Sequence, residues 1–326
     1  MRAERISINW NPDLSIYASE PFLRAVGDEY GWIGGIDDSE TLRCILPFTI
    51  IRKPFMRMAR FRVETMHINR ELSIEEEKLF LNSAIEFLRS VGVDVIIPAT
   101  TNTIFRTYPD GATAAPYGTY IIDLTQPEEK IWGNLSASHR RKVRLAVKQG
   151  VEIREGIEYL ETAYGLVRDT FKRSAMPFMG FDAFRRIVAG LGENVEIMVA
   201  QHRGAVQGCV VIPFSQYSAY YVYGGSIPRP ITGATNLLHW KAIRQFRELG
   251  VRRYDFVGVR INPEKGSKQE GLSIFKKRFG GRLVQGYMWK YPIRPLKYRV
   301  YSLGIKLVRG GDIVDAESHK LKMSEQ

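Results

Sequence analysis

The sequence predicts an α/β protein with mixed sheets, built from two similar domains in tandem. Its 326 residues suffice for two domains of ordinary size, each with its own core. A strand-like run around Cys44 and Phe48 has a counterpart around Cys209 and Phe214, and such repeated segments recur at offsets of roughly 158–166 residues. A helix, a glycine and a strand follow in both copies. This alternation predicts a mixed α/β domain in each half of the chain.

The first copy predicts a short helix and two strands between residues 21 and 48. Ser73 and Glu76 then form a capping box, which indicates the start of a longer helix. Gly92 suits the end of this helix, and 93–97 is an apolar strand. The helix has one apolar face, made of Phe80, Ala84, Phe87 and Val91.

The second copy repeats this order with more polar residues. Thr232 or Gly233 begins a predicted helix, and Gly250 suits the left-handed position that ends it. A strand follows at 253–257, and a second helix begins near Glu270. That helix presents an aromatic ring and a cation at adjacent positions, Phe275 and Lys276.

Two tyrosines precede the helix of the second copy. Tyr221 and Tyr223 are two residues apart, so we expect them on the same side of a strand. The glycines at 224 and 225 would permit close approach of a ligand to the backbone. The pair predicts a tyrosine-lined channel for a peptide or sugar, and the alternative is two half-buried strand residues.

A basic helix is predicted between the two copies, over residues 136–150. Arg140, Arg144 and Lys148 recur at every fourth position, with Arg141 beside them. Convergent cations of this kind are typical of phosphate binding, for which the planar arginine fork is well suited. The alternative is a solvated helix face, although no acidic residue interrupts the segment.

The composition indicates a soluble globular protein with a preference for anionic partners. Apolar residues make up 44% of the chain and charged residues 25%, with a formal net charge of +12. We expect a cytoplasmic protein, because the N-terminus has no secretory signal and no apolar run is long enough to span a bilayer. Cys44 and Cys209 are expected to be buried thiols, and the five histidines show no metal-ligand spacing.

The C-terminal segment predicts a further helix, followed by a polar, mobile tail beyond Gly310. Basic and aromatic residues are mixed through the helix at 296–309. It could pack on the protein, which we expect, or lie on a membrane interface as a peripheral contact. Its apolar stripe consists of Leu296, Val300, Leu303 and Leu307.

Several of these segments resemble the FemABX family, transferases that build peptide cross-bridges using aminoacyl-tRNA. The resemblance is carried by Tyr-Asp-Phe-x-Gly at 254–258, Phe-Lys-x-x-Phe-Gly at 275–280, and the tyrosine–glycine run at 221–226. The segment 136–151 is similar to the basic helix that leads into the second domain of these proteins. The same segment also resembles acyltransferases of the broader GNAT superfamily.

The resemblance implies two GNAT-like domains side by side. Residues 1–130 would form the acceptor side, and 131–295 would form the donor side. Residues 296–326 would then be the C-terminal helix and mobile tail. The implied reaction is attack of an amine on an aminoacyl-tRNA ester, which needs no cofactor and no metal. The implied acceptor is an anionic or lipid-linked precursor of the cell wall.

The resemblance also implies roles for individual residues. Lys276 would stabilise the oxyanion. Asp255 would receive a proton from the attacking amine, or else form hydrogen bonds to the loop that follows its strand. Phe275 would stack on the terminal adenosine of the tRNA, or else belong to the core with Phe279. The other implied substrate-binding residues are Tyr221, Tyr223, Arg140, Arg141, Arg144, Lys148 and Asn236.

Two positions depart from the family pattern. Val26 stands where a lysine is usual and Ile97 where an aspartate is usual, so the acceptor could differ from the common precursor. Arg52, Lys53 and Arg57 could supply another anion site. One alternative function is acyl transfer from coenzyme A to a surface-polysaccharide or nucleotide-sugar amine, although the glycine pattern that binds the pyrophosphate is incomplete. Another is an anion-binding protein without catalysis.

Overall fold

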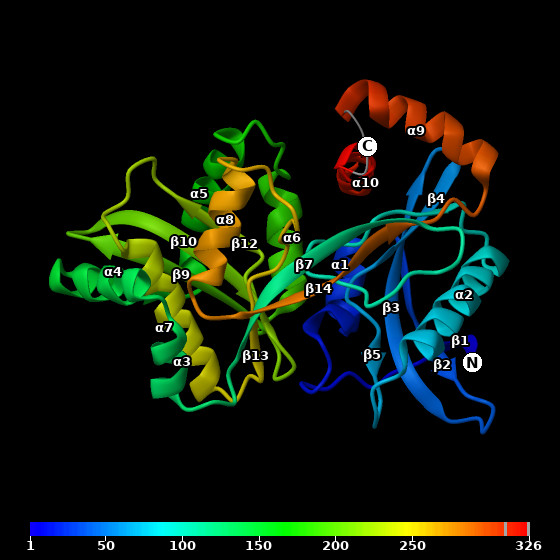
Figure 1. Ribbon diagram of the computed structural model, residues 1–326, viewed down its shortest axis with the longest axis horizontal. Coiled ribbons are helices and arrows are strands. Elements are labelled where there is room, and N and C mark those ends of the chain that lie inside the picture. Colours follow the sequence, from blue (N-terminus) through cyan, green and yellow to red (C-terminus); the bar gives the residue numbers. More distant parts are fainter. Residues whose placement is uncertain (310–311, 325–326) are drawn as a thin grey trace.

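The computed structural model describes residues 1–309 and 312–324, which form two halves, each centred on β-sheet (Figure 1). The N-terminal sheet has the order β1-β2-β3-β4-β6, with β5 paired to β3. Neighbouring strands are antiparallel except for β4 and β6, which are parallel. Its strands are β1 (Arg2–Ile6), β2 (Glu29–Ile36), β3 (Leu42–Lys53), β4 (Met56–Phe61), β5 (Met66–His67) and β6 (Val95–Ile96). The helices of this half are η1 (Ile16–Ala18), α1 (Glu20–Val26) and α2 (Ile74–Ser90).

Helix α2 confirms the predicted capping box. The Ser73 side chain accepts from the backbone N–H of Glu76, and the Glu76 carboxylate accepts from the N–H of Ser73. After the helix, Gly92 adopts a left-handed φ of 79°, as expected for a terminating glycine. The fully buried face differs from the predicted one, because Phe87 is only half-buried. It consists of Phe80, Leu81, Ala84, Ile85 and Leu88.

The C-terminal half contains two four-stranded sheets, with the orders β12-β10-β9-β8 and β11-β13-β7-β14. The two-domain mixed α/β fold predicted from the sequence is thus confirmed. The strands are β7 (Thr113–Asp123), β8 (Val151–Glu155), β9 (Val195–His202), β10 (Ala205–Pro213), β11 (Ala219–Tyr220), β12 (Tyr223–Ser226), β13 (Arg253–Asp255) and β14 (Arg282–Lys290). The helices are α3 (Glu128–Asn134), α4 (Ala137–Lys148), η2 (Ile157–Tyr159), α5 (Leu160–Lys172), α6 (Phe181–Leu191), α7 (Ala234–Glu248) and α8 (Lys268–Lys277).

A two-stranded ribbon of β7 and β14 joins the halves. The strands pair antiparallel from Arg282 opposite Ile121 to Lys290 opposite Thr113. Figure 1 shows both running from one half into the other. At the far end, the buried Trp289 packs against aromatic rings of the N-terminal core. Because the ribbon belongs to both halves, the domain boundaries after residues 130 and 295 remain predictions.

The halves also meet through helices and charges. Helix α1 packs on α6 at Gly190, where an added Cβ would lie 2.6 Å from the Cβ of Ala25. Close approach of the two helices therefore requires glycine at this position. Glu64 of the N-terminal half forms an ion pair with Arg253 of β13 at 2.6 Å. This ion pair lies beside the candidate site described below.

The C-terminal segment forms α9 (Pro295–Arg309) and α10 (Ile313–Ser324). We expected the apolar stripe of α9 to pack on the protein, but its described members are exposed. Residues 313–324, expected to be part of a mobile tail, form a helix that packs on β7 and buries Val314. The tail residues 310, 311, 325 and 326, and the Leu307 side chain, lie outside the described part. No helix in the described part has the length and apolar character needed to cross a bilayer.

Candidate active site

The candidate site is centred on the turn that follows β13. Asp255 is the last residue of this strand and is only 3% exposed. Its Oδ1 accepts hydrogen bonds from the Thr119 hydroxyl at 2.5 Å and the Val257 N–H at 2.7 Å. Both bonds fall on one oxygen, so Oδ2 is the carboxylate oxygen that could take a proton. The bond to Val257 also stabilises the turn itself.

The backbone of this turn is unusual. Val257 has a φ of 40° and Gly258 a φ of 43°, both in the left-handed region. A β-branched residue rarely adopts this conformation, and such strain is often found at functional sites. The carbonyls of Val257 and Gly258 both accept hydrogen bonds from the Lys276 ammonium, the latter at 2.9 Å. An ammonium has three donors, so Lys276 keeps one for another group.

Burial moves the pKa values of both ionisable groups toward neutrality. Desolvation raises the pKa of Asp255 to about 6, against the opposing effects of Arg253 and of the hydrogen bonds to Oδ1. Desolvation lowers the pKa of Lys276, which is 8% exposed, to about 8, and the nearby Asp255 carboxylate opposes this shift. Between these values, the pair is a carboxylate and an ammonium. Perturbed pairs of this kind are typical of catalytic sites.

Asp255 lines a polar cavity of about 190 Å³ between the two halves. Its wall combines four carboxylates with two arginines, so the cavity suits a ligand that carries an amine. One wall is the group of Glu64, Arg253 and Tyr217, in which the Tyr217 hydroxyl donates to Glu64 and its ring lies 4.2 Å from the Arg253 guanidinium carbon. The lining residues are Glu64, Thr65, His67, Glu71, Glu77, Asn102, Ile104, Arg106, Thr119, Ile121, Tyr217, Arg253, Asp255 and Val284.

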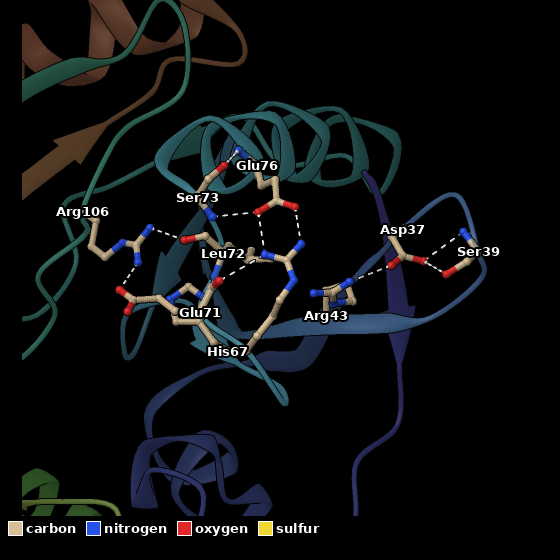
Figure 2. A network of polar contacts seen from close by, with 10 residues as sticks. Asp37, Ser39, Arg43, His67, Glu71, Leu72, Ser73, Glu76 and Arg106 are labelled. Carbon is tan, nitrogen blue, oxygen red and sulfur yellow. Dashed lines mark hydrogen bonds and ion pairs between the residues drawn. The ribbon is translucent and has the colours of Figure 1, made fainter.

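Arg106 also lines this cavity (Figure 2). Arg106 pairs with Glu71 and donates to the Leu72 carbonyl at 2.6 Å, and Figure 2 shows His67 beside this group. Its Nε also lies 2.9 Å from a carboxylate oxygen of the buried Glu77. Burial raises the pKa of Glu77, and the Arg106 charge opposes this effect. The first turn of α2 and the segment before it thus supply Glu77 and Glu71 to the cavity.

The predicted aromatic residues fall into two groups. Phe275 is half-buried and packs against His139, His239 and Phe279. The Tyr221 ring lies 4.4 Å from His239, so it joins the same group. Tyr223 packs instead on Phe178 and Phe184. The structure therefore does not bring Tyr221 and Tyr223 onto one wall, because Tyr221 precedes β12 and Tyr223 begins it.

Two buried polar atoms near this aromatic group have no described partner. They are Nδ2 of Asn236 and Nδ1 of His139, and both residues are at least nine-tenths buried. The other ring nitrogen of His139 lies 3.2 Å from the Phe275 carbonyl. Burial lowers the pKa of His139 to about 4 and that of His239 to about 3, so both rings are neutral at pH 7. Asn236, predicted to bind substrate, thus has an unused donor.

The basic helix α4 does not present its cations as one group. Arg140 turns back onto the end of α3 and donates to the carbonyls of Gly133 at 2.6 Å and Leu135 at 2.5 Å. Arg144 lies over the Trp132 ring, at 5.7 Å from its centroid. Arg141 and Lys148 are exposed. The first two residues brace the junction of α3 and α4, and phosphate binding by this helix remains a prediction.

The other predicted anion contacts are also engaged. Arg52 and Arg57 both pair with Glu29, at 2.9 and 2.8 Å. Val26 is one of the two positions that differ from the family pattern. Its backbone carbonyl accepts a hydrogen bond from the buried Arg62 at 2.6 Å. Within residues 1–309 and 312–324, no three His, Cys, Asp or Glu side chains are arranged to hold a metal ion.

The start of α7 is where coenzyme A would place its pyrophosphate in a GNAT protein. Gly233 precedes the helix with a φ of 89°. An added Cβ at this position would lie 2.1 Å from the Lys142 carbonyl oxygen of α4. The start of α7 therefore packs closely on α4, and a residue with a side chain would not fit at position 233.

Part of the chain matches a known family of transferase domains. Residues 133–270 match the acetyltransferase (GNAT) domain family, which confirms the predicted transferase class. No curated protein matches the chain. The FemX crystal structure has a TM-score of 0.66 at 14% identity, covering 91% of this chain and 99% of FemX. The predicted likeness to FemABX proteins is therefore confirmed for the fold.

Two further structures share the fold. The C-terminal domain of a putative lysylphosphatidylglycerol synthetase from Agrobacterium fabrum has a TM-score of 0.53 at 13% identity, covering 90% of this chain and 92% of that domain. A tandem GNAT protein from the clavulanic acid biosynthesis pathway has a TM-score of 0.50 at 13% identity, covering 84% of this chain and 86% of that protein. The tandem arrangement of GNAT-like halves is thus shared by solved relatives of the fold.

Sequence reasoning missed the residues that the N-terminal half contributes to the cavity. Glu64, Glu77 and Arg106 come from loops and a helix far from β13 in sequence. Glu77 lies in the first turn of α2, where an acidic residue is ordinary, so nothing in the sequence signals its burial beside Arg106. The available signal for a site was the pair Arg253 and Asp255. These residues are two apart in one strand, so their side chains lie on the same face of the sheet.

Proposed function

We propose that this protein is an aminoacyltransferase that forms an amide bond between an aminoacyl-tRNA donor and an amine on a precursor of the peptidoglycan type. One observation carries the proposal. The buried Asp255 and Lys276 are held at one strained turn, with pKa values of about 6 and about 8, and Asp255 lines an acidic cavity. A base and a cation placed together are what aminolysis of an ester requires.

The reaction follows from these two groups. The neutral acceptor amine attacks the ester carbonyl carbon, so a C–N bond forms and the carbonyl oxygen becomes an oxyanion. The remaining N–H donor of Lys276 would stabilise that oxyanion. The Oδ2 of Asp255 would take the proton that the amine loses. Collapse breaks the C–O bond of the ester, and the proton finally resides on the leaving hydroxyl.

Two features support tRNA as the donor. The formal charge of +12 favours a large polyanion. Phe275 lies beside Lys276 on α8 and is half-buried, so its ring retains surface on which a terminal adenosine could stack. Asn236 would supply a further hydrogen bond to the substrate.

The cavity supports an acceptor amine. An amine arrives in water as an ammonium ion, and the carboxylates of Glu64, Glu71 and Glu77 would attract it. The ammonium would release one proton to water before it attacks, and Asp255, at the edge of the same cavity, would receive the second proton, which the amine loses on attack. The names of two neighbours of the fold, FemX and a putative lysylphosphatidylglycerol synthetase, fit a role in cell-envelope aminoacyl transfer in the cytoplasm.

The second candidate function is N-acyl transfer from acyl-coenzyme A to an amine of a surface polysaccharide or nucleotide sugar. The match of residues 133–270 to the acetyltransferase (GNAT) domain favours it, since this fold generally uses acyl-coenzyme A. It would use the same base and cation, with a thiolate in place of the alcohol as leaving group.

A donor-transfer assay separates the two candidates. The purified chain is incubated with UDP-MurNAc-pentapeptide and either tRNA charged with ¹⁴C-labelled amino acids or ¹⁴C-acetyl-coenzyme A. We expect label to enter the peptide from tRNA only, and calorimetry to detect no micromolar binding of acetyl-coenzyme A. Transfer from acetyl-coenzyme A alone, with tRNA binding absent in a gel shift, would overturn the proposal in favour of the second candidate.

A further inference from the structure

Helix α9 carries an apolar stripe that faces away from the protein. Leu296, Val300 and Leu303 are 78%, 75% and 63% exposed. Their spacing of four and three residues places them on one side of the helix, within about 60° of each other at 100° per residue. Large apolar side chains gathered in this way are uncommon on a free surface and mark interaction sites.

The other side of α9 fixes the orientation of the stripe. Tyr298 is about 200° around the helix from Leu296 and packs in the cluster of Met56, Met58 and Val95. Lys297 donates to the buried Asp94 at 3.0 Å. The helix is therefore attached by its inner side, and its apolar stripe cannot turn inward without losing these contacts. Figure 1 shows α9 along the outer edge of the N-terminal half.

The hairpin between β3 and β4 presents a second apolar group at the same end. Phe55 is 93% exposed at its tip, with a φ of 70°. A turn that requires a positive φ after Pro54 favours glycine, and an aromatic residue there is a genuine outlier. Phe55 contributes little to the core from this position. The next residue, Met56, belongs to the cluster on which Tyr298 of α9 packs, so this end of the hairpin lies near α9.

We propose that the Phe55 tip and the α9 stripe together form a docking surface for an anionic lipid bilayer. Exposed cations flank the apolar residues, with Lys53 at the tip and Arg299 on α9. Apolar side chains that insert below lipid headgroups, with basic residues beside them, are the features of an interfacial helix. Each such cation near an anionic membrane adds to the attraction. This surface would operate whichever acyl donor the site uses.

The arrangement of the apolar groups favours a bilayer over a protein partner. The ring at the hairpin tip and the exposed helix face belong to two separate elements, whereas a docked peptide needs a groove. A membrane requires only that the apolar groups reach a common plane. Glycine would fit the backbone at position 55 better than phenylalanine does. The Phe55 ring is therefore better explained by contact with a ligand than by a role in folding.

Flotation of the full chain with vesicles tests the proposal. We expect it to float with phosphatidylcholine vesicles that contain phosphatidylglycerol, and less at high salt. Phe55→Gly should bind about tenfold more weakly, from the loss of one inserted ring, while its melting temperature stays equal or rises. The double variant Val300→Ser with Leu303→Ser should lose binding further.

Ile157→Ser is the control, because Ile157 is an apolar residue in the other half that is 62% exposed, like Leu303. It should float like the unmodified chain. The proposal would be overturned if the unmodified chain stays unbound, or if Phe55→Gly and Ile157→Ser bind equally. Light scattering that shows a dimer abolished by the double variant would instead assign the surface to a second copy of the chain.

Discussion

Asp94 and Asp255 occupy comparable places in the two halves but have opposite electrostatic surroundings. Each lies where a strand follows a helix and a glycine turn, and each is almost fully buried. Asp94 accepts from the Arg57 N–H at 2.8 Å and from Lys297 at 3.0 Å, with Arg294 at 3.4 Å. Although burial acts to raise its pKa, these contacts leave the pKa of Asp94 below its usual value. The pKa of Asp255 is raised instead.

The comparison shows how one repeated element serves two purposes. In the first half, Asp94 pairs with Arg294 and Lys297, and these contacts attach α9 to the protein. In the second half, Arg253 is engaged by Glu64 and Tyr217, and Asp255 keeps an oxygen for a ligand. The aspartate that is less well paired is the one that lines a cavity. The surroundings of Asp255 suit proton transfer from a ligand, and those of Asp94 stabilise the folded protein.

Replacing each aspartate by asparagine should separate these purposes most clearly. We expect Asp255→Asn to lower turnover by about 10²–10⁴, since a general base contributes that much. Its melting temperature should not fall, because the amide oxygen can still accept from Thr119 and Val257 and a buried charge is removed. Asp94→Asn should leave turnover nearly unchanged and lower the free energy of unfolding by about 1–2 kcal/mol, since its cationic partners are partly exposed. Equal losses of turnover in the two variants would contradict the comparison.

The pH dependence of the reaction offers a second test. The rate should rise as pH increases through about 6, where Asp255 becomes a carboxylate, and fall above about 8, where Lys276 loses its proton. Each limb should approach a tenfold change per pH unit. The measurement is a turnover profile from pH 5 to 9 in buffers of constant ionic strength. A flat profile across this range would mean that neither group acts in the step observed.

The ion pair between the halves should show coupling in a double-mutant cycle. Glu64→Gln, Arg253→Gln and the double variant are compared by denaturant unfolding. We expect a coupling of about 1–3 kcal/mol, because the pair is largely buried and also contacts Tyr217. A coupling near zero would mean that the junction is held by the β7–β14 ribbon and the α1–α6 contact without help from these charges.

Arg140→Ala should produce the smallest change. Its hydrogen bonds to the end of α3 predict a loss of about 1 kcal/mol of stability. The salt dependence of tRNA binding should be unaltered. Arg141→Ala is the control, because Arg141 is exposed on the same helix. A reduced salt slope for Arg140→Ala would restore the phosphate-binding role expected from the sequence.

The sequence predicted the elements well where local signals are strong. The Ser73–Glu76 capping box, the left-handed glycines at 92 and 250, and the buried cysteines all match the structure. These features depend on neighbouring residues only. The prediction that Tyr221 and Tyr223 share one face of a strand was wrong, because the strand begins at Tyr223 and Tyr221 lies before it.

Features that depend on long-range packing could not be predicted. The β7–β14 ribbon joins segments more than 160 residues apart, and no periodicity records that pairing. The spacing on α4 suggested that Arg140 and Arg144 converge on a ligand. Instead, Arg140 donates to a carbonyl at the end of α3, and Arg144 lies over the Trp132 ring. The acidic cavity is likewise assembled from both halves. Asp255 and Lys276 could be proposed as site residues because each lies in a motif that resembles the family, at 254–258 and 275–280.

Turnover of Lys276→Met compared with Lys277→Met tests the account most directly. Both variants keep the aliphatic stem on the same helix, but only Lys276 is buried and bonded to the Val257 and Gly258 carbonyls. Losing a donor to an oxyanion lowers the rate by about 10²–10³. We predict such a loss for Lys276→Met, with substrate affinity little changed and no fall in rate above pH 8. Lys277→Met should remain within about twofold of the unmodified chain. Equal, small effects in both variants would contradict the account.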